Sequence, residues 1–227
     1  MRQPRHAGGD TEGQHAEKHR PVDEQHTDRD GNSNSTCLFQ LFNGMFPFKV
    51  IKPRHTLISL RMKIETVTLL GGTGFVGHHL ATALSKAGYK VRILARRPER
   101  HRDLRVLANC RIVQLEAFDV AWLTQEFTHA DAVINLVGIL NESKSATFEE
   151  LHVRLPEKVI EACLQSKTLR LLHMSALNAS ESQNKSSYLH TKGKGENRVH
   201  TLSAGTVRVT SFRPSVIFGP GDSFFNR

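Results

Sequence analysis

Cysteine is scarce in this chain of 227 residues. The three cysteines, Cys37, Cys110 and Cys163, lie far apart in the sequence and form no CxxC motif. An odd number of widely spaced cysteines supports neither a disulfide framework nor a zinc site, and it is typical of proteins from reducing compartments. We therefore expect no metal site and no dependence on disulfides.

Long apolar runs are lacking as well. A membrane-spanning helix needs about 20 consecutive apolar residues. The nearest candidate, residues 45–60, is interrupted by Pro47 and Pro53 and contains four basic side chains. The N-terminus lacks the charged-then-apolar order of a secretory signal, and seven acidic residues within residues 1–61 argue against a mitochondrial transit peptide. These absences predict a cytoplasmic protein with no transmembrane segment.

A concentrated basic surface is also missing, although the formal net charge is +9. Residues 1–61 contain nine Lys or Arg and seven Asp or Glu, so they carry +2, and the remaining +7 is spread over several predicted elements. Proteins that bind nucleic acid gather such charge on one face or along one stripe. We expect no nucleic-acid partner, and we attribute the charge to solvated surface and partly to attraction of an anionic cofactor.

The chain divides into two segments of different composition. Residues 1–36 are polar and show no apolar periodicity, so they cannot bury enough surface to offset the entropy of ordering, and residues 37–61 are irregular. We predict a disordered or irregular N-terminal extension over residues 1–61 and a folded domain over residues 62–227. The abrupt change at Met62 suggests the hypothesis that the native protein starts there, which N-terminal sequencing of the natural protein would test.

From residue 64 onward, apolar strands alternate with helices. Several strands are near-continuous apolar runs, as expected when both faces of a sheet are buried. The alternation predicts an α/β fold of the Rossmann type, a doubly wound parallel sheet between two layers of helices. The predicted strands are 64–70, 90–95, 111–115, 132–138, 169–175 and 206–212; the predicted helices are 75–87, one that begins at Pro98, 120–127, 147–165 and 187–202.

A glycine-rich loop joins the first strand to the first helix. It satisfies GxGxxG, and with Gly71 in the first position it also satisfies GxxGxxG. Glycines at this spacing permit the tight turn, the approach of the backbone to a pyrophosphate and close packing of helix on strand. The helix start adds free N–H groups that favour phosphate. The predicted dinucleotide-binding residues here are Gly71, Gly72, Thr73, Gly74, Phe75, Val76 and Gly77.

The second strand ends in Ala95-Arg96-Arg97. NAD-binding proteins commonly place an acidic residue near this point, where it binds the ribose hydroxyls, whereas guanidinium groups suit the 2′-phosphate of NADP. Arg96 and Arg97 could also be two exposed side chains at the end of a strand. The charge favours NADP(H) as the cofactor, with NAD(H) as the alternative.

Three further residues suggest acid–base chemistry. Tyr188 and Lys192 form a YxxxK motif, and their i, i+4 spacing puts both side chains on one face of the predicted helix. A nearby ammonium favours the phenolate, so we expect Lys192 to lower the pKa of Tyr188. Ser175 ends the fifth strand, where a parallel sheet places its ligand groups. Ser175 could therefore polarise a carbonyl while Tyr188 moves the proton and a nicotinamide carries hydride.

Together these motifs resemble the short-chain dehydrogenase/reductase superfamily, in its extended and atypical branch of NAD-dependent epimerase/dehydratase-like proteins. The resemblance covers residues 63–227 and implies that Ser175, Tyr188 and Lys192 form the catalytic triad. It also implies that the segment after the sixth strand, residues 213–222, lies near the nicotinamide. Further cofactor contacts implied by the resemblance are Leu136, Val137, Gly138 and Pro214.

Residues 135–140, 173–177 and 218–224 are similar to one subgroup, the bacterial and mitochondrial proteins that resemble the dehydrogenase-like accessory subunit of respiratory complex I. This resemblance implies NADPH binding, partners in the respiratory chain or in quinone metabolism, and a location peripheral to the inner membrane. Nothing in the composition itself points to such partners.

The chain departs from the family pattern in three places. The family commonly has an aspartate near the adenine, and here either Glu116 or Asp119 takes that place. His152 stands where the family often has a tetrad asparagine, and we interpret it as a packing or solvated residue. The family also continues beyond the sixth strand with most of its substrate-binding lobe, so we expect the chain to be C-terminally truncated.

These features leave several functions open. The first is an NADP(H)-dependent oxidoreductase-like enzyme linked to respiratory complex I or quinone metabolism. The second is a non-catalytic accessory or assembly protein in which bound NADP stabilises the fold. The third is an NAD-dependent sugar-nucleotide epimerase or dehydratase, against which Arg96 counts. The motifs identify neither a substrate nor an oligomeric state.

Overall fold

The computed structural model describes residues 63–182 and 186–222. The N-terminal extension predicted for residues 1–61 and the proposed start at Met62 lie outside the described residues. So do the last two residues of the 218–224 motif.

A six-stranded sheet forms the centre of the described domain. Its strands follow the order β3-β2-β1-β4-β5-β6, and every neighbouring pair is parallel. The strand order reverses between β1 and β4, and sheets of this kind bind ligands beyond the carboxyl ends of their strands at that point. The strands are β1 (Thr66–Leu70), β2 (Lys90–Ala95), β3 (Cys110–Gln114), β4 (Ala132–Asn135), β5 (Arg170–Met174) and β6 (Arg208–Phe212).

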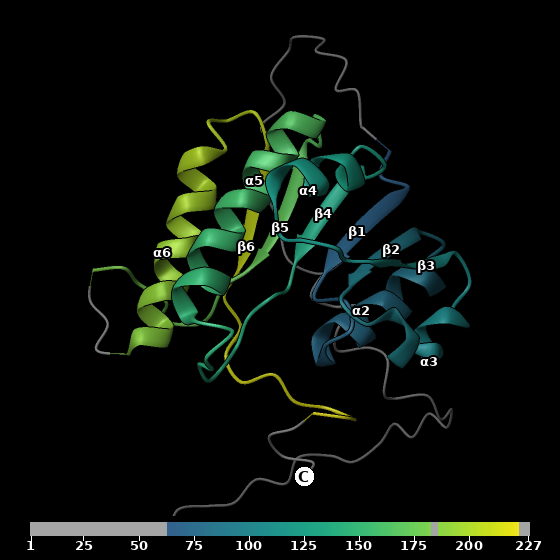
Figure 1. Cartoon of the computed structure of the whole chain (residues 1–227), viewed down its shortest axis with the longest axis horizontal. Coiled ribbons are helices and arrows are strands. Elements are labelled where there is room, and N and C mark those ends of the chain that lie inside the picture. The colour runs from purple at the N-terminus through teal and green to yellow at the C-terminus, as the bar shows by residue number, and fades with distance from the viewer. Residues whose placement is uncertain (1–62, 183–185, 223–227) are drawn as a thin grey trace, which may run out of the picture. The chain divides into compact units, whose positions relative to one another are not determined.

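Helices cover both faces of this sheet, so the predicted doubly wound, three-layer Rossmann fold is confirmed. Helices α2 (Phe75–Lys86) and α3 (Arg102–Arg105) lie beside β2 and β3 in Figure 1. Helices α4 (Val120–Phe127), α5 (Leu155–Ser166) and α6 (Ser187–Leu202) cover the opposite face.

Two apolar cores hold the layers together. The core under α2 and α3 contains Leu80 and Leu104, and the core under α4, α5 and α6 contains Phe127 and Ile160. Burying one such side chain contributes about 1.5–3 kcal/mol before entropy is subtracted. The paired cores therefore position the carboxyl edge of the sheet.

Three elements differ from the prediction. Strand β4 stops at Asn135 because its side-chain Oδ1 accepts a hydrogen bond from the N–H of Val137 (3.1 Å), which turns the chain. The element predicted to begin at Pro98 is a 3₁₀ turn (Pro98–Arg100) followed by the short α3.

The third difference lies in the predicted helix 147–165. It begins as a π-helix over Glu149–Arg154 and continues as α5. Pro156, in the first turn of α5, has no N–H and its ring would collide with the carbonyl four residues earlier, that of His152. The wider π turn is the observed accommodation of this proline.

Candidate functional site

The glycine loop adopts the geometry that its sequence predicts. Gly71 has a φ of +76°, which favours glycine, and a Cβ there would lie 3.0 Å from the backbone nitrogen of Val137. A Cβ on Gly77 would lie 2.3 Å from the carbonyl oxygen of Gly71. Both glycines therefore permit contacts that any other residue would disturb.

The start of helix α2 carries no acid in its first turn and no side-chain cap. Its N-cap is Gly74, so the first N–H groups have no partner within the helix. A helix start of this kind, approached by glycine backbone, suits an anionic pyrophosphate.

A cavity of about 380 Å³ opens beside this helix start. Two histidines, His78 and His79, line it although no sequence motif marks them. Nε2 of His79 forms a hydrogen bond of 2.9 Å with the carbonyl oxygen of Pro220, so the segment after β6 folds back to the glycine loop. The lining residues are Thr73, Gly74, Phe75, His78, His79, Pro220 and Gly221.

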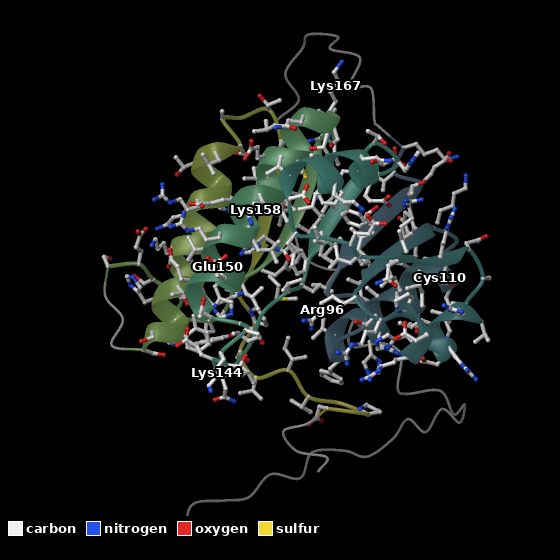
Figure 2. All side chains as sticks on the ribbon, viewed as in Figure 1. Arg96, Cys110, Lys144, Glu150, Lys158 and Lys167 are labelled. Atoms are coloured by element: carbon white, nitrogen blue, oxygen red, sulfur yellow. The ribbon has the colours of Figure 1, made fainter. Side chains whose placement is uncertain are left out.

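A second cavity, of about 550 Å³, begins at the carboxyl end of β2. Arg96 and Arg97 line it together with Arg100, His101 and Thr73, and their contact with a cofactor stays a prediction. Figure 2 shows Arg96 at the carboxyl edge of the sheet. No acidic side chain of the described residues lines this cavity, so its charge suits a phosphate better than a neutral ribose. Arg100 and His101 come near Arg96 because the 3₁₀ turn at Pro98 brings the chain back.

Ser175 follows β5 directly and is buried, and its N–H donates to the carbonyl oxygen of Phe212 (2.7 Å). Its hydroxyl has no hydrogen-bond partner among the described residues. A buried hydroxyl without a partner costs stability. Ser175 is therefore available to a group that enters from the sheet edge.

Tyr188 and Lys192 lie one turn apart on α6. Nζ of Lys192 is buried and donates to the carbonyl oxygen of Met174, the residue before Ser175. Burial lowers the pKa of Lys192 to about 8, an effect that Glu196 partly offsets. Burial also raises the pKa of Tyr188, so the expected lowering by the ammonium is wrong for this arrangement.

The segment after β4 meets the same helix. A Cβ added to Gly138 would lie 3.8 Å from Nζ of Lys192 and 3.6 Å from Nε2 of His152. The implied cofactor segment, Leu136, Val137 and Gly138, and the YxxxK helix are therefore brought together. Pro214 lies beside the segment after β5, where its carbonyl oxygen accepts from the N–H of Leu177 (2.8 Å).

The two acidic candidates for the adenine contact differ in their surroundings. Oδ1 of Asp119 accepts from the N–H of Trp122 (2.8 Å) and caps α4. Glu116 is exposed in the loop that follows β3. Asp119 thus has a local structural role, and an adenine contact by either residue stays a prediction.

Two glycines of α6, Gly193 and Gly195, allow close backbone contacts with neighbouring segments. Neither was among the predicted site residues. A Cβ on Gly193 would lie 2.5 Å from the backbone nitrogen of Ser180, and one on Gly195 would lie 1.7 Å from the carbonyl oxygen of His152. Two glycines directly after the YxxxK motif were the available signal. They let the helix bearing Tyr188 approach the π-helix closely.

A dinucleotide fits these features, because they combine a glycine cradle, a free helix start, a basic cavity and an unpartnered serine hydroxyl. Within residues 63–182 and 186–222, no group of three or more His, Cys, Asp or Glu side chains could hold a metal ion. No helix in the described part of the chain is long and apolar enough to cross a membrane.

Known proteins share this domain. The chain is 28% identical over 166 residues to the mitochondrial NADH-ubiquinone oxidoreductase 40 kDa subunit of Neurospora crassa, a match covering 72% of this chain and 43% of that protein. It is 29% identical over 160 residues to the ceramide reductase of Caulobacter vibrioides, over 69% of this chain and 48% of that protein. The chain thus spans less than half the length of these relatives.

Solved structures share the fold. The UDP-glucuronic acid 4-epimerase from Bacillus cereus in complex with NAD superposes with a TM-score of 0.57 at 20% identity, covering 68% of this chain and 58% of that chain. The sequence pattern of the NAD dependent epimerase/dehydratase family matches residues 67–227. That range contains the glycine loop, both cavities and the Ser175–Tyr188–Lys192 group, and the chain belongs to the NAD dependent epimerase/dehydratase family.

Proposed function

We propose that residues 62–227 form a domain that binds NADP(H) in preference to NAD(H). The observation that carries this proposal is the cavity at the end of β2, which among the described residues is lined by three arginines, one histidine and Thr73 and by no acid. A 2′-phosphate would meet charge-assisted hydrogen bonds there, each worth about 1.5–3 kcal/mol. An NAD-dependent epimerase or dehydratase has no need of that positive charge.

Calorimetry on the purified full chain tests the preference. We expect NADPH to bind more tightly than NADH, and Arg96→Asp to weaken NADPH binding by about tenfold or more, the equivalent of 1.4 kcal/mol. Arg105→Asp is the matched control, because Arg105 is exposed on α3 and does not line the cavity. NADH binding at least as tight as NADPH would refute the preference and favour the sugar-nucleotide class.

We propose further that the domain acts in an oxidoreductase-like protein. Ser175 would hold a substrate carbonyl through its free hydroxyl, and Tyr188 would give its phenolic proton to the carbonyl oxygen as the alcohol forms. Lys192, one turn away on α6, would hold the ribose of the dinucleotide, because its ammonium can only donate hydrogen bonds. The bound dinucleotide would supply hydride to the carbonyl carbon, which balances the proton that the oxygen receives.

The name of the Neurospora crassa relative supports a link to the respiratory chain. We therefore propose partners among complex I or quinone-pathway proteins and a cytoplasmic location peripheral to the inner membrane. Fractionation of cells with salt washes tests this location. A protein that stays entirely in the soluble fraction at low salt would contradict it.

A non-catalytic accessory role is the second candidate, and the same relative, named as a subunit, favours it. Tyr188→Phe separates the two candidates, provided that calorimetry shows NADPH binding retained. A cellular phenotype like that of the deletion strain indicates catalysis, whereas an unchanged phenotype indicates a structural use of the cofactor.

A further inference from the structure

His152 joins its own π-helix to two other elements of the candidate site, although it was expected to be packing or solvated. It lies in the π-helix and is 1% exposed. Nε2 accepts a hydrogen bond from the N–H of Ile139 (3.1 Å), in the segment after β4. Nδ1 forms a hydrogen bond of 3.1 Å with Oγ1 of Thr191, between Tyr188 and Lys192 on α6.

The direction of each hydrogen bond follows from these partners. The backbone N–H of Ile139 can only donate, so Nε2 of His152 carries no proton. A neutral imidazole then carries its proton on Nδ1 and donates it to Thr191. The Thr191 hydroxyl remains free to donate its own proton to the carbonyl oxygen of Ser187 (2.9 Å) or Tyr188 (3.1 Å). One tautomer therefore satisfies the whole chain of bonds.

Aromatic contacts hold the ring in this orientation. Phe148 stacks on His152 with ring centroids 5.1 Å apart and planes at 19°. The ring of Tyr188 meets His152 edge to face at 5.3 Å and 87°. Stacked and edge-to-face contacts of this kind favour one orientation of the ring. The imidazole that bonds Ile139 therefore also touches the proposed acid–base residue.

The surroundings of His152 also favour its neutral imidazole. Burial and the nearby Lys192 ammonium lower the pKa of His152 to about 4. A protonated ring would present an N–H to the N–H of Ile139, which cannot accept it. At neutral pH the imidazole is thus uncharged and can keep both bonds.

We propose that His152 is a positioning residue that joins the cofactor segment after β4 to the YxxxK turn of α6. This inference rests on the proposed function, because the segment it holds contains Gly138, an implied cofactor contact. Its unexpected consequence is that NADPH affinity depends on Thr191, which lies across the imidazole from that segment. Thr191, which is hydrogen-bonded to the imidazole nitrogen opposite the one that binds Ile139, thus influences the cofactor site.

Nuclear magnetic resonance of the full chain, labelled with ¹⁵N-histidine, tests the bridge directly. Wild-type His152 is expected to carry its proton on Nδ1 and to remain neutral between about pH 5 and 8, where an ordinary histidine titrates. His152→Asn identifies the signal. A proton on Nε2 in the wild type would overturn the proposal, whether or not any dinucleotide binds.

Calorimetry with NADPH tests whether Thr191 influences the cofactor site, through a matched pair of variants of that residue. Thr191→Val removes the hydroxyl with little change in shape and should weaken NADPH binding by about tenfold, whereas Thr191→Ser should restore it to within about threefold of wild type. Phe148→Leu removes the stacking but neither hydrogen bond, and should also stay within about threefold.

The outcomes separate this inference from the proposed function. A wild type that binds neither NADPH nor NADH refutes the proposed function, and the tautomer of His152 then decides the bridge alone. If Thr191→Val binds NADPH as tightly as the wild type does, the proposed coupling is overturned. Thermal unfolding of each variant confirms that the comparison is made between folded proteins.

Discussion

Acid should destabilise this domain mainly through two buried histidines, His152 and His173. Burial, and to a smaller extent the nearby Lys192 ammonium, lowers the pKa of His152 to about 4 and that of His173 to about 3. Each imidazole titrates near 6.5 in an unfolded chain. Between the folded and unfolded values, only the unfolded chain binds the proton. The free energy of unfolding is therefore highest above about pH 6.5 and falls as pH falls through this window.

The size of the effect follows from the pKa differences. One pKa unit corresponds to about 1.36 kcal/mol. At pH 5, about 1.5 units below the unfolded pKa, each histidine has lowered the free energy of unfolding by about 2 kcal/mol. Together the two have lowered it by about 4 kcal/mol. Domains have total stabilities of about 5–15 kcal/mol, so this loss is a large share.

Urea unfolding at a series of pH values measures the loss, and Trp122, the single tryptophan, reports it by fluorescence. His152→Phe and His173→Phe should each lower the slope of unfolding free energy against pH, between about pH 5 and 6, by about 1.36 kcal/mol per unit. Gln125→Phe is the control, because Gln125 is exposed and has no titratable side chain, so the slope should stay unchanged. Wild-type slopes in both buried-site variants would refute the reasoning.

Three further predictions concern the site itself. Between about pH 8 and 10.5 only the unfolded chain keeps the proton of Lys192, so the free energy of unfolding should rise with pH there by about 3 kcal/mol, and Lys192→Met should abolish that rise in urea melts. Gly77→Ala puts a Cβ 2.3 Å from the Gly71 oxygen and should weaken NADPH binding by about tenfold or more in calorimetry; unchanged affinity would mean that the loop adapts without cost. Ser175→Ala removes a buried, unpartnered hydroxyl and should raise the unfolding free energy by about 1 kcal/mol, whereas a fall would reveal a partner for that hydroxyl.

The sheet and its edge could be predicted because they depend on local patterns. Apolar runs bounded by turns located all six strands, and the bounds predicted for helix 187–202 match α6. The glycine spacing likewise predicted a tight loop with close packing of the first helix, and the structure places Gly77 against Gly71. In each case the determining residues are neighbours along the chain.

Other features depend on contacts between distant residues, which spacing does not reveal. His152 has no recognisable motif, because its partners Ile139 and Thr191 lie on other elements. The pKa of Tyr188 depends on how deeply α6 is buried. Burial raises this pKa, whereas the charge of Lys192 was expected from the sequence to lower it. Arg100 and His101 reach the cavity of Arg96 only through the turn at Pro98.

The π-helix has a consequence for comparing this chain with others. A π turn holds one residue more than an α turn, so it behaves as a single inserted residue that rotates everything before it by about 100° relative to α5. An unbroken α-helical wheel over residues 147–165 would therefore misplace Phe148 relative to α5. Sequence alignments should open a one-residue gap within Glu149–Arg154, and deleting a residue there should turn Phe148 away from Tyr188.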